Sequence, residues 1–224
     1  MVVTIEGVLD ADRLQTARAL LARASFVDGR LSAGTAASRV KRNEEVQPGS
    51  GVVESLNRVV MGALVQHPTY QAAALPYRVA VPYYARYTPG MAYGDHVDDP
   101  VMGPAGGRYR SDVSITVFLS APEDYDGGEL VVRTPFGPQT VKLAAGDAVL
   151  YPSSSLHRVA EVTRGERLVA VTWVQSLVRD PQRRELLYEL GLARETLLRE
   201  RPSAQETALL DRSYVNLVRM WADV

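Results

Sequence analysis

The chain contains no cysteine among its 224 residues. Disulfide bonds, thiolate zinc sites, iron–sulfur clusters and cysteine nucleophiles are therefore excluded together, and any metal must bind to histidine and carboxylate side chains. Histidine is also scarce, with three residues in the whole sequence. Each histidine can therefore be considered on its own as a candidate ligand.

Strong net charge and long apolar runs are absent as well. The formal net charge is −1, with acidic and basic residues mixed along the chain, so we expect no nucleic-acid partner. No run approaches the roughly 18 apolar residues of a membrane span, and residues 1–10 lack the pattern of a secretory signal. We therefore expect a cytoplasmic protein without a membrane partner.

Helical and β-type patterns alternate along the first 178 residues. The spacing of apolar residues predicts helices over 11–24, with Asp10 as N-cap, and over 52–66, separated by a polar stretch over 28–50. Short β-rich runs bounded by Gly, Pro and Asp follow at 77–87, 109–119, 129–133, 140–143, 148–151, 156–162 and 167–178. No helix-length segment separates these runs, which favours antiparallel pairing in a jelly roll of about eight strands.

The last part of the chain returns to a helical pattern. Two apolar stripes predict two helices, one carrying Leu186, Leu187, Leu190, Leu197 and Leu198 and the other carrying Leu210, Tyr214, Leu217, Val218 and Trp221. Pro202 separates them, and Ser203 with Glu206 is typical of a capping box. The sequence thus predicts a mainly β domain with N-terminal helices over 1–178 and a C-terminal helical hairpin over 179–224. The hairpin either packs on the barrel or forms a homodimer contact.

The triplet His96-Val97-Asp98 is the first candidate for a metal site. In an extended segment, side chains two residues apart point to the same face, so His96 and Asp98 can share one cation, whereas Asp99 has the opposite parity. His157, at the start of a predicted strand about sixty residues later, can complete the set. Two imidazoles and one carboxylate suit ferrous iron in oxygenases because they leave open positions on the metal. The triplet alone is a weak signal, because such residues also occur together on protein surfaces.

Arg167 adds a second feature to this candidate site. It follows His157 by ten residues, across a predicted turn over 163–166, and is expected on the neighbouring strand. A guanidinium group can hold a carboxylate through two parallel hydrogen bonds, and 2-oxoglutarate has a carboxylate at the end distant from its metal-chelating keto acid. The alternatives are that Arg167 is an exposed strand residue or that Arg164 takes this role, although Arg164 lies beside Gly165 in the turn and is expected to face solvent.

These motifs together resemble a known family. The run Arg86-Tyr87-Thr88-Pro89-Gly90-Met91-Ala92-Tyr93-Gly94-Asp95-His96-Val97-Asp98, the segment Gly127-Gly128-Glu129-Leu130, and His157 with Arg167 are similar to the prolyl and lysyl hydroxylase-like 2-oxoglutarate dioxygenases. Within that superfamily the chain looks most like the bacterial PKHD-type hydroxylases linked to iron uptake. The resemblance covers essentially the whole chain, including the helical tail.

The resemblance implies a role for six residues. His96, Asp98 and His157 would bind Fe(II) and act in catalysis, and Arg167 would bind the distal carboxylate of 2-oxoglutarate. Tyr87 matches a tyrosine that helps to hold this carboxylate, and Trp173 matches an aromatic residue near the metal. Packing in the barrel wall or core is the alternative for both.

Three other residues are expected to be structural. Gly127 and Gly128 suit a turn. His67, in the expected loop after the second helix, is interpreted as a surface or structural histidine.

The implied activity is hydroxylation of a C–H bond with O₂ and 2-oxoglutarate, releasing succinate and CO₂. Retention of Asp98 argues against halogenation, which in this superfamily needs the carboxylate position for halide. Ascorbate is a further cofactor that the resemblance leaves open. A non-catalytic, cupin-like metal-binding or sensing protein is the alternative, and a zinc hydrolase is disfavoured because no general base or nucleophile is well placed. The sequence does not identify the substrate, which is a peptide, an amino acid or another small molecule. The loops over 42–51 and 101–108 are expected to select it.

Overall fold

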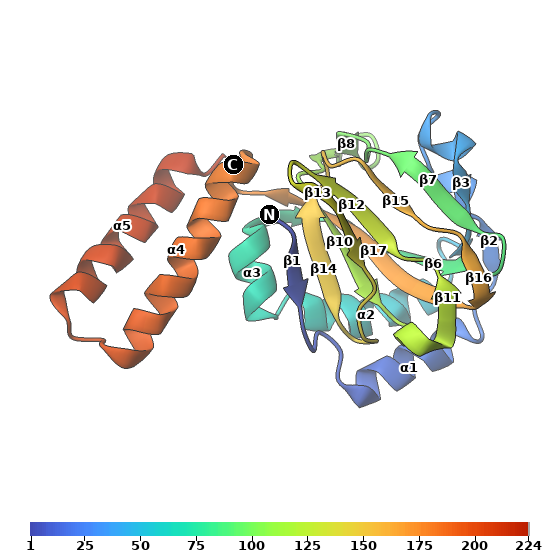
Figure 1. The fold of residues 1–224 in the computed structure, drawn as a ribbon, viewed down its shortest axis with the longest axis horizontal. Helices are drawn as coiled ribbons and strands as arrows, with labels where there is room; N and C mark the ends of the chain where they lie inside the picture. The colour runs from blue at the N-terminus through green and yellow to red at the C-terminus, as the bar shows by residue number, and fades with distance from the viewer. Residues whose placement is uncertain (224) are drawn as a thin grey trace.

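The computed structural model describes residues 1–223, which form two facing β-sheets with helices on one side (Figure 1). The larger sheet has the order β1 (Val3–Ile5), β14 (Ala148–Pro152), β10 (Val113–Phe118), β17 (Arg167–Ser176), β6 (Tyr83–Tyr87), β4 (Glu44–Val46) and β2 (Phe26–Asp28), with β5 (Pro76–Val79) also paired to β17. The smaller sheet has the order β13 (Gly137–Val141), β12 (Leu130–Thr134), β15 (His157–Val159), β7 (Ala92–His96) and β3 (Lys41–Arg42). The strand pairs are antiparallel, and the predicted jelly roll is confirmed.

The central strand β10 shows how the larger sheet separates two interiors. All six of its residues are buried, because both of its faces are covered. Val113, Ile115 and Val117 belong to the core between this sheet and the helices, whereas Phe118 belongs to the core between the two sheets. The alternate residues Ser114 and Thr116 share the side of Phe118, so the polar side chains of this strand face the space between the sheets.

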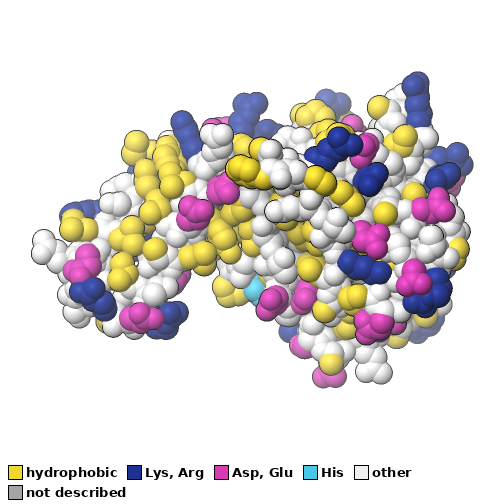
Figure 2. All heavy atoms as spheres, viewed as in Figure 1, with side chains coloured by type: hydrophobic (Ala, Val, Ile, Leu, Met, Phe, Trp, Pro, Cys, Tyr) yellow, Lys and Arg dark blue, Asp and Glu magenta, His cyan; other side chains and the backbone are white. Residues whose placement is uncertain are grey.

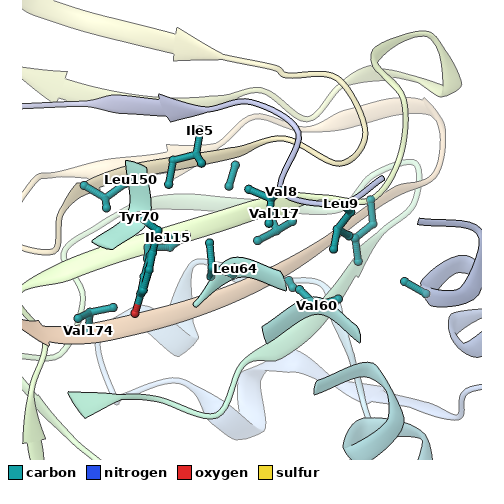
Figure 3. Packing of buried hydrophobic residues seen from close by; sticks show 14 of the residues in the cluster. Ile5, Val8, Leu9, Val60, Leu64, Tyr70, Ile115, Val117, Leu150 and Val174 are labelled. Carbon is teal, nitrogen blue, oxygen red and sulfur yellow. The ribbon is translucent and has the colours of Figure 1, made fainter. Parts of the chain in front are cut away.

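Three helices cover the outer face of the larger sheet: α1 (Ala11–Leu21), α2 (Gly51–Leu64) and α3 (Pro68–Ala74). In α2, Leu56, Val60 and Leu64 recur every four residues and are fully buried. Figure 3 shows Val60, Leu64 and Tyr70 from these helices against strand residues such as Ile115 and Val174. The predicted helices over 11–24 and 52–66 are thus present but end two to three residues early.

Helix α3 was not predicted. His67 is its N-cap: the Nδ1 atom accepts a hydrogen bond from the Thr69 backbone at 3.3 Å, and Nε2 lies 3.1 Å from the Glu6 carbonyl. Pro68 occupies the first turn, where a missing N–H is tolerated. The structural interpretation of His67 is confirmed, but the loop expected around it is wrong.

The polar stretch over 28–50 contains strands rather than an extended loop. Strand β3 joins the edge of the smaller sheet at Tyr93, and β4 joins the larger sheet at Ala85, so the chain crosses between sheets at Asn43. A buried ion pair between Lys41 and Glu45, with 2.5 Å between Nζ and Oε1, ties these two strands together. The periodicity of apolar residues could not reveal these strands, because two or three residues are too few to show a period.

Several predicted strand boundaries also differ from the structure. The run over 77–87 is two strands, β5 and β6, and the run over 156–162 contains only β15 before the chain continues into β16 (Val162–Gly165). Strand β16 pairs with β11 (Tyr125–Gly127), so the predicted turn over 163–166 is largely a strand. The expected loop over 101–108 begins in a small hairpin of β8 (Val101–Met102) and β9 (Tyr109–Arg110).

The C-terminal hairpin consists of α4 (Pro181–Glu200) and α5 (Gln205–Trp221), which project from one side of the sheets (Figure 1). Asp180 caps α4 by accepting hydrogen bonds from two backbone amides, whereas the predicted capping box of Ser203 and Glu206 is wrong. The N-cap of α5 is Ala204, which has no side-chain cap. Within the described part of the chain, every helix is too short or too polar to cross a membrane.

Candidate metal and co-substrate site

The two strands β7 and β15 bring His96 and His157 side by side in the smaller sheet. The two residues are register partners, and their rings lie 4.2 Å apart between centroids. Asp98 follows β7 by two residues and points to the same side, as the parity of the segment predicts. Its Oδ1 atom is 3.9 Å from Nε2 of each histidine, and one ligand atom from each residue lies within 4.8 Å of the others.

Each imidazole is held by a backbone carbonyl two residues before it. His96 Nδ1 lies 2.8 Å from the Gly94 carbonyl, and His157 Nδ1 lies 3.0 Å from the Ser155 carbonyl. With the proton on Nδ1, each ring donates to its carbonyl and presents the lone pair of Nε2 toward Asp98. Burial, together with the neighbouring His157, holds the pKa of His96 below its usual value of 6.5. A neutral ring is the form that binds a metal ion.

The carboxylate of Asp98 is held by a pair of buried serines. Ser114 donates a hydrogen bond of 2.5 Å to Asp98 Oδ2, and the Ser153 hydroxyl lies 2.7 Å from that of Ser114. This contact engages Oδ2 and leaves Oδ1 facing the histidines. Sequence reasoning missed Ser114; the only available signal was its position in the alternation of β10.

Arg167 is the first residue of β17 and lies in the same cavity as the three residues above. Its side chain is 2% exposed, and its Cζ lies 5.0 Å from the ring centre of Tyr87 and 5.7 Å from that of Phe118. In residues 1–223 no acidic side chain pairs with it, and its Nε has no hydrogen-bond partner. A buried guanidinium without a counter-charge is unfavourable unless an anion binds to it.

Two tyrosines border this guanidinium. Tyr87 is the register partner of Arg167, and burial raises its pKa to about 12, so its hydroxyl stays protonated and able to donate. Tyr125 was not singled out from the sequence; it is fully buried, and its hydroxyl has no partner in the described chain. Gly128, with φ of +66°, leaves room for both Arg167 and Tyr125, since a Cβ there would lie 3.0 Å from each.

The far end of β17 brings Trp173 to the same cavity. Its ring meets Tyr83 edge to face, with centroids 5.8 Å apart and planes at 74°. The Trp173 side chain is 9% exposed, yet its indole N–H has no acceptor among residues 1–223. By contrast, Arg164, the alternative to Arg167, faces solvent as the sequence predicted. It pairs with Asp126 at 2.7 Å.

All six residues singled out from the sequence line one cavity, and the crossing between β3 and β4 adds three more. Lys41, Asn43 and Glu45 are buried there. The amide nitrogen and oxygen of the Asn43 side chain both lack partners within the described residues. Sequence reasoning missed these residues because they lie in a stretch without periodicity.

The donor set fits a ferrous ion together with a dicarboxylic keto acid. Two neutral imidazole nitrogens and one carboxylate oxygen converge, which is the ligand set of non-haem Fe(II) oxygenases. The unpaired Arg167 in the same cavity suits a second carboxylate at a distance from the metal.

Comparison with known proteins agrees with this chemistry. Residues 82–175 match the family model of the 2OG-Fe(II) oxygenase superfamily, and residues 181–223 match the PKHD-type hydroxylase C-terminal domain. A PKHD-type hydroxylase from Thioalkalivibrio sulfidiphilus is 59% identical over 224 residues, covering all of both chains. The chain belongs to the PKHD-type hydroxylases. A second member of this family, from Acaryochloris marina, is 48% identical over 223 residues with full coverage of both chains.

The fold of this PKHD-type hydroxylase is shared with solved structures. A prolyl-4-hydroxylase from Pseudomonas putida superposes with a TM-score of 0.51 at 20% identity, covering 78% of this chain and 92% of that one. Membership of the family makes the protein a 2-oxoglutarate- and Fe(II)-dependent dioxygenase that uses O₂ and a substrate. The predicted enzyme class and its two cofactors, Fe(II) and 2-oxoglutarate, are thereby confirmed.

Proposed function

We propose that His96, Asp98 and His157 hold the Fe(II) ion and that Arg167 binds the distal carboxylate of 2-oxoglutarate, so that this cavity hydroxylates a substrate C–H bond. The observation that carries the proposal is the position of Arg167. Its guanidinium is buried in the cavity of the three metal-type ligands and has no acidic partner in the described residues. A dicarboxylic keto acid satisfies both ends of this cavity at once.

The residues of the cavity have separate tasks in this proposal. The two imidazoles offer Nε2, and Asp98 offers Oδ1 because Ser114 holds Oδ2. When bound, iron and 2-oxoglutarate supply the oxidising chemistry that places one oxygen atom of O₂ in the product, with release of succinate and CO₂. Tyr87 borders the guanidinium with a protonated hydroxyl, and burial of both excludes water from the carboxylate. Trp173 borders the same cavity.

The test compares Arg167→Ala with Arg164→Ala. Both substitutions remove one guanidinium from the same region of the chain, but Arg164 is exposed and paired with Asp126. Anaerobic protein with Fe(II) should develop a charge-transfer absorbance on addition of 2-oxoglutarate, and O₂ should then yield succinate. Arg167→Ala should weaken 2-oxoglutarate binding while Arg164→Ala should not. Equal behaviour of the two variants would contradict the assignment of Arg167.

The same experiment separates the enzyme from a cupin-like metal-binding or sensing protein. A metal-binding protein without co-substrate would bind Fe(II) equally well in both variants and would give no absorbance with 2-oxoglutarate. Loss of Fe(II) binding in His96→Ala with retained folding would in turn support the metal ligands. Adding ascorbate to the succinate assay tests whether this reductant, which we retain as an additional cofactor, raises turnover.

We also propose that residues 1–178 form the dioxygenase domain and residues 179–224 an extension that stabilises it. Arg184 in α4 donates to the carbonyls of Val178 at 2.6 Å and Asp112 at 3.3 Å, so the extension satisfies backbone groups of the barrel. A chain truncated after residue 178 should therefore keep its β-type circular dichroism but unfold at lower temperature. A truncated chain as stable as the full one would contradict this role.

A homodimer through the hairpin and a cytoplasmic location are two further proposals. Figure 2 shows hydrophobic side chains gathered over α4 and α5, and Leu186, Leu192, Leu209 and Met220 are between 45% and 73% exposed. Sedimentation of the wild type and of Leu192→Glu should distinguish a dimer from a monomer. Cell fractionation tests the location, which is motivated by the need for 2-oxoglutarate as co-substrate.

A further inference from the structure

A row of side chains crosses neighbouring strands of the larger sheet. Tyr87 on β6 is the register partner of Arg167 on β17. On the other side of β6, the register of β4 continues by one residue to place Asn43 beside Tyr87. The Gly29 amide donates to the Asn43 carbonyl at 2.9 Å, which extends the pairing of β2 and β4 to this residue. Because register partners point to the same face, Asn43, Tyr87 and Arg167 stand side by side and all line the cavity.

The side-chain amide of Asn43 is buried with a defined orientation. The residue is 4% exposed, and neither Nδ2 nor Oδ1 has a hydrogen-bond partner among residues 1–223. A Cβ at Gly29 would overlap Asn43 Oδ1 and lie 2.8 Å from its Cγ, so the oxygen points toward Gly29. The nitrogen is on the other branch of the amide and faces the Tyr87 side of the row. A buried amide without partners is unfavourable unless a ligand satisfies it.

Tyr87 lies between this amide and the guanidinium of Arg167. The Arg167 Cζ atom is 5.0 Å from the centre of the Tyr87 ring. Burial raises the pKa of Tyr87 to about 12, whereas the Arg167 guanidinium and the Asn43 amide both act to lower it. The amide therefore lies near the Tyr87 hydroxyl, although the two groups do not form a hydrogen bond of normal geometry. The Tyr87 hydroxyl is thus flanked by hydrogen-bond donors from two strands.

The three polar groups of the row together match the acceptor positions of one carboxylate. A carboxylate has two oxygens with about four lone-pair positions, and a buried carboxylate needs donors for them. A guanidinium can donate two parallel hydrogen bonds, and the Tyr87 hydroxyl and the Asn43 amide nitrogen can each donate one. Arg167 and Tyr87 alone would leave one position without a donor.

We propose that Asn43 is a further binding residue for the distal carboxylate of 2-oxoglutarate, to which its amide nitrogen donates a hydrogen bond. The inference rests on the proposed function, because it takes Arg167 as the charged partner of that carboxylate. Asn43 thereby contributes to the selection of a dicarboxylic keto acid over a monocarboxylic one. The crossing between the two sheets supplies part of the co-substrate site.

Two keto acids of equal chain length test this assignment. 2-Oxopentanoate has the metal-chelating keto acid of 2-oxoglutarate but ends in a methyl group instead of the distal carboxylate. Anaerobic titration of the Fe(II)-loaded protein, followed by the charge-transfer absorbance, gives the dissociation constant of each acid. Asn43→Leu should weaken the binding of 2-oxoglutarate roughly 10- to 100-fold, because a hydrogen bond to a charged group is lost. The binding of 2-oxopentanoate and of Fe(II) should be unchanged.

Asn57→Leu is the matched control. Asn57 in α2 accepts a hydrogen bond of 2.9 Å from the Tyr84 hydroxyl, on the side of the larger sheet that the helices cover. This control should leave both dissociation constants unchanged. Without ligands, Asn57→Leu deprives Tyr84 of its partner and should lower the free energy of unfolding, whereas Asn43→Leu removes an amide that has no partner and should not. Chemical denaturation measures this second readout, which does not depend on activity.

Three results would overturn the role of Asn43. Asn43→Leu could bind 2-oxoglutarate as tightly as the wild type, or it could weaken both keto acids equally, as a general disturbance of the cavity does. A loss of stability as large as that of Asn57→Leu would show that Asn43 has a structural role instead.

Failure of this inference is distinguishable from failure of the proposed function. If the wild type gives no absorbance with 2-oxoglutarate, or if Arg167→Ala binds it as tightly as Arg164→Ala, the proposed function itself fails. If the wild type and the two arginine variants behave as proposed while Asn43→Leu binds 2-oxoglutarate normally, only the role of Asn43 is refuted.

Discussion

The metal end and the guanidinium end of the cavity differ in how completely their polar groups are satisfied. At the metal end, His96, His157 and Asp98 each have one hydrogen bond that fixes their orientation. At the guanidinium end, Arg167 Nε and the Tyr125 hydroxyl are buried without partners in the described residues. The first end is organised before any ligand binds, whereas the second is completed only by an anion.

This difference implies that the two ends respond to substitution in opposite ways. Removing a partner at the metal end leaves a polar group without its orienting bond, so the site should lose affinity for metal. Removing the guanidinium at the other end takes away a buried charge that the empty protein does not balance. Co-substrate binding should then suffer while folding does not.

The largest expected effect is that of Arg167→Leu at the guanidinium end. The substitution should weaken 2-oxoglutarate binding on the order of 100-fold or more, because a buried charge partner of the carboxylate is lost. Metal affinity should be unchanged, and the free energy of unfolding of the ligand-free protein should not fall. Titration of 2-oxoglutarate and chemical denaturation measure the two quantities. A large loss of stability without ligand would remove the contrast between the two ends.

Ser114→Ala is the corresponding change at the metal end. Without the hydrogen bond to Oδ2, the Asp98 carboxylate can rotate, and metal affinity should fall roughly 10- to 100-fold. Ser114→Thr keeps a hydroxyl and should recover part of the loss, and Ser153→Ala, one bond further away, should have a smaller effect. Metal titrations under anaerobic conditions give these affinities. Equal affinities in wild type and Ser114→Ala would show that Asp98 needs no orienting partner.

Gly128→Ala tests the packing that supports the guanidinium end. A Cβ would lie 2.9 Å from Val162 Cγ2 and 3.0 Å from Arg167 Cδ, at a residue with φ of +66°. Gly137→Ala is a matched control, because φ is also positive, at +113°, and no atom lies within 4 Å. Gly128→Ala should lower the free energy of unfolding by about 1–3 kcal/mol more than Gly137→Ala, measured by denaturation. It should also weaken 2-oxoglutarate binding, whereas the control should leave binding unchanged.

The smallest expected effect is a pH dependence at the metal end. Since the pKa of His96 is lowered in the folded protein, the unfolded chain binds more protons as the pH falls below 6.5. The stability of the metal-free protein should therefore be complete above this pH and decrease below it, by at most about 1.4 kcal/mol per pH unit for this one group. Denaturation curves at several pH values measure the slope. The variant His96→Asn should show a shallower slope, and an equal slope would assign the effect elsewhere.

The three candidate metal ligands and Arg167 could be predicted from the sequence, because the prediction needed only local geometry. The parity of His96 and Asp98 follows from an extended backbone. Arg167 follows His157 by ten residues as expected, but β16 lies between them and Arg167 belongs to the larger sheet rather than to the strand beside His157. The long helices and most strands of the sheets were likewise visible as periodic patterns. These features need no knowledge of which strand lies beside which.

The remaining site residues depend on register and on crossings between sheets. Ser114 reaches Asp98 only because β10 lies in the larger sheet with its polar face toward the smaller one. Asn43 and Glu45 reach the cavity through strands too short to show a period, and Tyr125 belongs to a strand paired with a segment expected as a turn. The error at Ser203 arose because a capping motif in sequence does not fix where a helix begins.

The buried pair of Lys41 and Glu45 bears on how ligands reach the cavity. It fastens one sheet to the other where the chain crosses between them, and Arg167 and Trp173 stand six residues apart on β17, about 20 Å along the strand. Because this buried ion pair holds one wall of the cavity, we expect 2-oxoglutarate to pass Trp173 on its way to Arg167. A substrate bound near Trp173 first would block 2-oxoglutarate. We therefore expect ordered binding, in which 2-oxoglutarate binds before the substrate. High substrate concentrations should then inhibit turnover, and added 2-oxoglutarate should relieve this inhibition competitively. Steady-state kinetics without substrate inhibition would argue for a second entrance to the cavity.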